Sequence, residues 1–114
     1  MGKRFSVFKL TVAAVALTAA NILAAPKPLT VWIMPNGASP QETLEKRLDL
    51  FTKKTGIPTK VQVLDWGESW NRITQALSGQ QEAPDVLQLG TTWIPYFASR
   101  KEIKPLNAEL SSIH

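Results

Sequence analysis

The chain of 114 residues contains no cysteine, and its only histidine is the last residue, His114. Without cysteine the chain can form neither a disulfide nor a thiolate metal site, and it offers no thiol nucleophile. It also lacks the residue that bacterial lipoproteins acylate after signal cleavage, so no lipid anchor of that kind is expected. The fold must therefore depend on the burial of apolar side chains.

Motifs for catalysis and metal binding are missing as well. The sequence has no G-x-S-x-G nucleophile elbow, no G-x-x-x-x-G-K-[ST] phosphate loop and no H-E-x-x-H motif. Asp65 could in principle pair with another acid, but no spacing of carboxylates indicates such a pair. We therefore expect a protein that is not an enzyme, with no catalytic residue, no metal and no cofactor.

The N-terminus has the composition of a secretory signal peptide. Its first nine residues carry three cations and no acid, a mostly apolar run follows over residues 10–20, and small residues lead to Ala24 and Ala25. The apolar run is shorter than the roughly 20 residues that a membrane-spanning helix needs. Residues 1–25 are therefore predicted to be a signal peptide, with cleavage after Ala24 or Ala25 favoured over an uncleaved anchor.

Removal of the signal peptide changes the charge of the protein. The full chain has a formal net charge of +4, but without Lys3, Arg4 and Lys9 it has ten cations against nine acids, a balance of +1. Nucleic-acid binding would require a basic patch or stripe. We therefore expect no nucleic-acid partner and an exported, soluble protein with no stable membrane insertion.

Signals for strands and helices alternate along the rest of the chain. Predicted strands are rich in β-branched and other apolar residues, and predicted helices repeat apolar residues at intervals of three and four. Strands are expected at 29–34, 59–64 and 85–90, and helices at about 40–55, 66–78 and 93–99. This order predicts an α/β fold in which a parallel sheet with right-handed crossovers carries helices on its faces.

Several of the predicted helices carry capping signals. Ser39 and Glu42 have the spacing of a capping box, and Pro40 suits the first position of a helix. Gly56 stands where a left-handed C-cap is expected. The Thr91-Thr92 pair could cap the third helix.

Ligands of open α/β sheets bind beyond the carboxyl ends of the strands. Here the loops at those ends cover residues 34–37, 64–67 and 89–93, whereas Asp85 lies away from them and is assigned a structural role. A sugar presents hydroxyls to polar groups and an apolar C–H face to an aromatic ring, so the composition of these loops suits one. Their candidate binding residues are Asn36, Asp65, Trp66, Thr91, Thr92 and Trp93.

Structural roles compete with ligand binding for several of these residues. Trp32 lies in the middle of a strand and Trp70 lies on the apolar stripe of the second helix, so both are predicted to be core. Trp66 is balanced between core and ligand contact. Trp93 is the better binding candidate, although it could pack under the third helix, and Asp65 could be only an N-cap.

Five short segments resemble one family in their order and spacing. The segments are Leu29-Thr30-Val31-Trp32, Phe51-x-x-x-Thr55-Gly56-Ile57, Ile73-x-x-Ala76-Leu77-x-x-Gly79, Ala83-Pro84-Asp85-Val86 and Ile103-x-Pro105-Leu106. With the signal peptide, they resemble the N-terminal start of bacterial extracellular solute-binding proteins of family 1, the sugar-binding type related to maltose-binding proteins. Lys101 departs from the pattern, because many relatives have glycine in that turn.

The resemblance implies a monomeric periplasmic protein with two α/β lobes joined by hinge strands. Such a protein binds a sugar or oligosaccharide in the cleft between the lobes and delivers it to the membrane permease of an ABC importer, without catalysis. The ligand contacts that the resemblance implies are Asn36, Gly37, Asp65, Trp66, Thr91, Thr92 and Trp93.

Members of this family have several hundred residues. Residues 26–114 are therefore expected to form an incomplete N-terminal lobe, and the absence of a closing strand pattern or clear stop after residue 100 suggests a truncation. Three alternatives to a transport role stay open: a non-functional remnant, a small exported interaction module and a small exported α/β enzyme.

Overall fold

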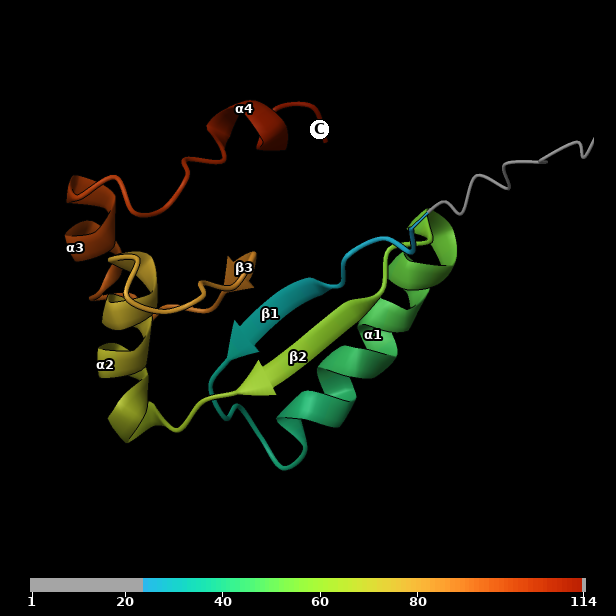
Figure 1. The fold of residues 1–114 in the computed structure, drawn as a ribbon, viewed down its shortest axis with the longest axis horizontal. Coiled ribbons are helices and arrows are strands. Elements are labelled where there is room, and N and C mark those ends of the chain that lie inside the picture. Colours follow the sequence, from blue (N-terminus) through green and yellow to red (C-terminus); the bar gives the residue numbers. More distant parts are fainter. Residues whose placement is uncertain (1–23, 114) are drawn as a thin grey trace, which may run out of the picture.

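The computed structural model describes residues 24–113 (Figure 1). The predicted signal peptide, residues 1–25, lies outside the described residues except for its last two. The structure has the predicted α/β alternation and adds a short helix that was not predicted. Its elements are β1 (Leu29–Ile33), α1 (Pro40–Thr55), β2 (Thr59–Val63), α2 (Trp66–Leu77), β3 (Val86–Leu87), α3 (Ile94–Ser99) and α4 (Asn107–Leu110).

The three strands form one parallel sheet with the order β2-β1-β3, which confirms the predicted parallel sheet. β3 is shorter than the strand expected at 85–90. The Gln88 amide still donates to the Trp32 carbonyl at 2.8 Å, but the amide of Met34, the residue after β1, donates to the Gln88 side-chain oxygen at 3.1 Å. The ladder ends here because a side chain has replaced the backbone partner.

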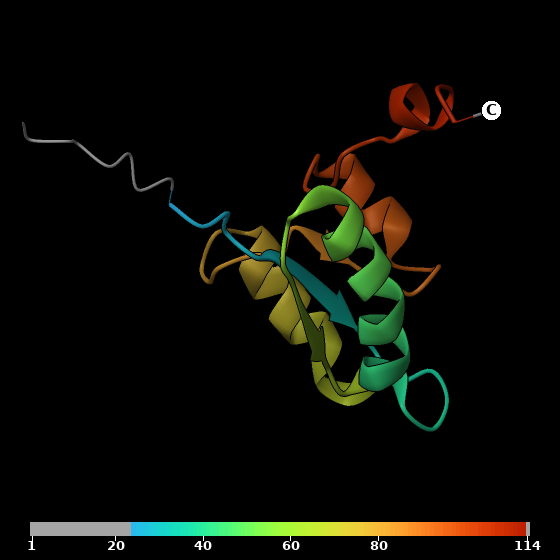
Figure 2. The same cartoon turned by 90° about the vertical axis from the view of Figure 1, so that its right-hand side faces the viewer.

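Helices cover both faces of the sheet. α1 packs against β2 on one face, and α2 and α3 lie on the other, as Figure 1 shows; Figure 2 views the same arrangement from the side of α1. Because side chains alternate along a strand, Val31 and Val61 are buried toward α1, whereas Trp32 is buried toward α2 and α3. The main core cluster on the latter face consists of Trp32, Met34, Leu64, Ile73, Ala76 and Phe97.

The bounds of α1 agree with the prediction, but its N-cap does not. Pro40 opens the helix, and Gly56 closes it in the left-handed region at φ 75°, with its amide donating 2.8 Å back into the last turn. The predicted capping box is wrong. Ser39 adopts φ −141° and ψ 66°, and its hydroxyl caps no amide of the described chain, while Glu42 pairs with Lys46 one turn further on at 2.7 Å.

The predicted threonine cap of α3 is also wrong. α3 begins at Ile94, and its N-cap position is Trp93. The Trp93 amide donates to the Gly90 carbonyl at 2.9 Å, which closes a turn over the Thr91-Thr92 pair. This turn leaves both threonines exposed before the helix, one or two residues too early to cap it.

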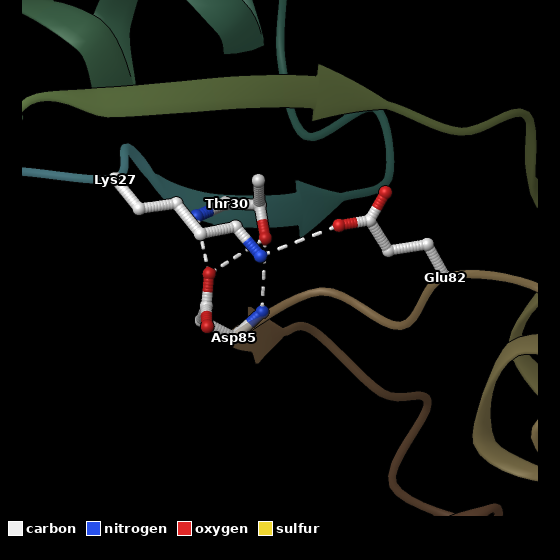
Figure 3. Close-up of polar contacts among 4 residues, drawn as sticks. All are labelled: Lys27, Thr30, Glu82 and Asp85. Atoms are coloured by element: carbon white, nitrogen blue, oxygen red, sulfur yellow. Dashed lines mark hydrogen bonds and ion pairs between the residues drawn. The ribbon is translucent and has the colours of Figure 1, made fainter.

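A polar clip joins the start of β3 to β1 (Figure 3). The Asp85 carboxylate accepts hydrogen bonds from the amide and the hydroxyl of Thr30, both at 2.8 Å. The Asp85 amide donates in return to the Thr30 hydroxyl oxygen at 3.0 Å. These bonds to the ionised carboxylate lower the pKa of Asp85, and Lys27 nearby lowers it further. Asp85 therefore has the structural role that was predicted for it.

Candidate functional site

The loop after β1 is fixed to the end of β3 by side-chain amides. Asn36 Nδ2 donates to Gln88 Oε1 at 2.9 Å and to the Met34 carbonyl at 3.0 Å. Because these two bonds occupy both hydrogens of the Asn36 amide, its Oδ1 is the atom that this exposed residue can offer to a ligand. Asn36 is thus held in place, and its Oδ1 can accept a hydrogen bond from a ligand.

Trp66 joins the start of α2 to the loop after β1. Its Nε1 donates to the Pro35 carbonyl at 3.1 Å, while 43% of the residue stays exposed. Of the two roles weighed for Trp66, core packing is therefore excluded. The hydrogen bond fixes the polar end of the indole, and the exposed ring remains available for contact with a ligand.

Trp93 connects the exposed Trp66 to the core. Its ring centroid lies 6.1 Å from that of Trp66 and 5.4 Å from that of Trp70, with edge-on geometry in both pairs. Gly90 makes room for Trp93, because a β-carbon at position 90 would lie 3.1 Å from the ring. The three indoles form a continuous row that runs from half-buried to exposed. We call Trp66, Trp93 and Trp70 the tryptophan row.

Asp65 and Gly37 have roles in the backbone of the same edge. Asp65 Oδ1 accepts from the Gly67 amide at 2.8 Å, so the proposed N-cap role is confirmed. A carboxylate has a second oxygen, so the cap leaves Asp65 able to contact a ligand as well. Gly37 adopts φ 95° with no heavy atom within 4 Å of the place of a β-carbon. Glycine is therefore required at position 37 by the backbone conformation and not by close packing.

The core predictions for the other two tryptophans are confirmed. Trp32 is only 8% exposed, and Trp70 is half-buried against the core cluster. The buried positions of α2 are Ser69, Ile73 and Ala76, so the buried face is rotated slightly from the predicted apolar stripe, which consists of Trp66, Trp70, Ile73 and Leu77. This rotation places Trp70 at the flank of α2, where it can contact Trp93.

Gln88 is the residue of this edge that sequence reasoning missed. It is half-buried, and its side-chain oxygen holds both the Met34 amide and Asn36. The available signal was a single amide within the apolar run Val86-Leu87-Gln88-Leu89. A polar residue in such a strand must find hydrogen-bond partners.

The chemistry of these residues suits non-covalent recognition. The edge combines an amide oxygen, hydroxyls, a carboxylate and exposed aromatic surface, a set typical of sites for polar ligands that also have an apolar face. Within residues 24–113, no three His, Cys, Asp or Glu residues lie close enough together to hold a metal ion. In the same span no helix has the length and apolarity needed to cross a membrane.

Comparison with known proteins finds a similarity over part of the chain. The chain is 34% identical over 70 residues to the diacetylchitobiose binding protein DasA of Streptomyces coelicolor (strain ATCC BAA-471 / A3(2) / M145). The aligned region covers 61% of this chain and 16% of DasA, so the chain matches a small part of that protein. No protein-family profile matches the chain. The similarity to DasA supports the general family that the sequence motifs resemble, and no particular member of it.

Proposed function

We propose that the chain belongs to the substrate-binding component of an ABC-type importer, and that it binds a sugar or oligosaccharide at the carboxyl-end edge of its sheet. In this proposal residues 1–25 direct export to the periplasm, and residues 26–114 form part of the N-terminal lobe. The bound sugar is passed to a membrane permease. The similarity to a sugar-binding protein and the α/β fold both support this role.

The observation that carries the proposal is the tryptophan row beside Asn36. Trp66 presents exposed ring surface, and its indole is fixed at one end by Pro35. Asn36 is held so that it can accept a hydrogen bond from a sugar hydroxyl. An aromatic surface next to an ordered acceptor matches the two kinds of surface that a sugar ring offers.

The other proposed contacts surround this pair. Asp65 supplies its second carboxylate oxygen, Thr91 and Thr92 supply exposed hydroxyls, and Trp93 supplies the ring that supports Trp66. Gly37 allows the loop after β1 to turn beside Asn36. These residues come from one edge of one lobe, so we expect affinity to be weak, because ligand sites bury most of the ligand between opposing walls.

Nuclear magnetic resonance of the ¹⁵N-labelled chain tests the proposal directly. The chain has four tryptophans and therefore four indole N–H signals, of which Trp66 and Trp93 report on the site and Trp32 reports on the core. Titration with diacetylchitobiose, maltose and other oligosaccharides should move the Trp66 and Trp93 signals with saturation for at least one sugar, while Trp32 stays in place. Sugars that move no indole signal, or only that of Trp32, would contradict the proposal.

A further inference from the structure

A polar hollow lies on the face of the sheet that carries α2, away from the tryptophan row. It has a volume of about 260 Å³. Neighbouring residues of β1 and β2 form its floor, α2 contributes one side, and the loop that precedes β3 contributes the other. The residues that line it are Thr30, Trp32, Lys60, Gln62, Arg72 and the loop 81–84. We call it the basic hollow.

The strand register explains why polar groups gather in the basic hollow. Thr30 lies beside Lys60 in the parallel ladder, and Trp32 lies beside Gln62. Residues two apart on a strand point to the same face, so these four side chains form one block. The block places the ammonium group and the amide of the outer strand β2 next to the hydroxyl of the central strand β1.

Arg72 adds a second, oriented cation. Its guanidinium carbon lies 5.4 Å from the ring centroid of Trp32, and the residue is half-buried. A guanidinium over an aromatic face is attracted to the ring while its N–H donors, which lie in the guanidinium plane, stay free for other partners. Trp32 is buried in the core, so it holds Arg72 in place before any ligand arrives.

In the described part of the chain neither cation has an acidic partner, whereas the nearby acids are already bonded to other groups. No ion pair within residues 24–113 includes Lys60 or Arg72. Glu82, the acid of the basic hollow, lies 3.4 Å from Lys27, and Asp85 is bonded to Thr30 (Figure 3). Two positive charges, neither in an ion pair among residues 24–113, therefore face the same small volume, against the single carboxylate of Glu82.

We propose that the basic hollow binds the oxyanion group of a small molecule, a carboxylate or a phosphate, between Lys60 and Arg72. Arg72 presents its planar donors to two oxygens of the anion, and Lys60 adds a point charge from the floor of the hollow. The Gln62 amide can donate to any oxygen that remains, whereas the Thr30 hydroxyl already donates to Asp85. This site is separate from the sugar site and does not depend on it.

Titration of the labelled chain with inorganic phosphate and, separately, with acetate tests this site. Each anion replaces chloride at constant ionic strength, so that a change in electrostatic screening does not contribute to the observed shifts. We expect saturable shifts of the Arg72 Nε–H and the Trp32 indole signals, while the Trp66 and Trp93 indoles stay in place. A response to phosphate alone or to acetate alone identifies which oxyanion the hollow prefers. No saturable response to either would overturn the proposal.

Two variants with the same charge change separate the site from general attraction of anions. Lys60→Gln should weaken binding about tenfold, because it removes one charge-assisted hydrogen bond. Lys53→Gln removes the same charge from the exposed last turn of α1, on the other side of the sheet, and should leave the affinity unchanged. Equal losses in the two variants would mean that anions respond to net charge alone, which would also overturn the proposal.

Discussion

Substitution of Gly90 by alanine tests how tightly the tryptophan row is packed. A β-carbon at position 90 would lie 3.1 and 3.2 Å from two ring carbons of Trp93, closer than ordinary van der Waals contact. The ring cannot move away freely, because Trp66 and Trp70 lie at its edges. The variant must therefore shift Trp93 or strain the turn that precedes α3.

Two opposing effects set the size of the change. Insertion of a methyl group into a packed site costs about 1–3 kcal/mol. Gly90 does not have a positive φ, so alanine can adopt its backbone conformation and should recover about 0.4–1 kcal/mol by restricting the unfolded chain. The clash is the larger of the two, and we expect Gly90→Ala to lower the free energy of unfolding by about 0.5–2 kcal/mol.

Urea unfolding followed by tryptophan fluorescence measures this difference. Gly67→Ala is the comparison variant, because its β-carbon would meet no ring and would lie 3.0 Å from the Asp65 oxygen that caps α2. Alanine there gains about 0.5–1 kcal/mol, since glycine within a helix is unfavourable, but it also disturbs the Asp65 cap, so we expect a net change near zero. If Gly90→Ala were no more destabilising than Gly67→Ala, the packing described for Trp93 would be incorrect.

Three further variants probe the fold around the site. Phe97→Ala removes a fully buried ring of the core cluster and should cost about 3–5 kcal/mol, seen as loss of near-ultraviolet circular dichroism well below the melting temperature of the parent chain; an unchanged spectrum and melting temperature would contradict its core position. Lys101→Gly should raise stability by about 0.5–1 kcal/mol in urea unfolding, because Lys101 has φ 58° and a side chain disfavours that region more than glycine costs in entropy; a loss of stability would refute this. Asp85 has a lowered pKa, so its stabilising effect is present above the unfolded value of 3.8 and is lost as the pH falls through the lower folded value. Asp85→Asn should therefore melt at a lower temperature than the parent at neutral pH, and the gap should narrow on acidification; a gap independent of pH would exclude the carboxylate as its cause.

The elements that could be predicted are those whose signals are local. Pro40 and Gly56 fix the ends of α1 through their own backbone preferences, so both bounds were predicted correctly. The parallel sheet follows from the alternation of strands and helices and needs no detail of packing. The buried Trp32 follows from its place in the middle of a strand.

The features that could not be predicted depend on how distant segments meet. Ser39 has the right spacing for a capping box, but the loop before α1 gives it a ψ of 66°, and Glu42 finds Lys46 instead. The end of β3 depends on Gln88, whose partners lie more than fifty residues earlier in the chain. A contact between segments this far apart in the sequence cannot be predicted before the order of the strands in the sheet is known.

The candidate site shows the same division. The carboxyl-end loops were predicted from topology alone. In the structure Asn36 is bonded to Gln88, and Trp66 is bonded to Pro35, the residue before Asn36. The tryptophan row was not predicted, because contact of Trp93 with both Trp66 and Trp70 requires the relative placement of α2 and α3. The ligand-contact roles of all the site residues stay predictions: Asn36, Gly37, Asp65, Trp66, Thr91, Thr92 and Trp93.

The most direct test of the central claim is the affinity of a sugar for two matched aromatic variants. Trp66→Ala removes an aromatic ring that is 43% exposed in the proposed site, and Phe51→Ala removes one that is 36% exposed on α1, on the other face of the sheet. With the sugar that gives the largest indole shifts, Trp66→Ala should weaken binding at least about tenfold, as is common for a tryptophan at the centre of a binding surface. Phe51→Ala should bind like the parent chain. Unchanged binding by Trp66→Ala, or an equal loss in both variants, would contradict a sugar site at this edge of the sheet.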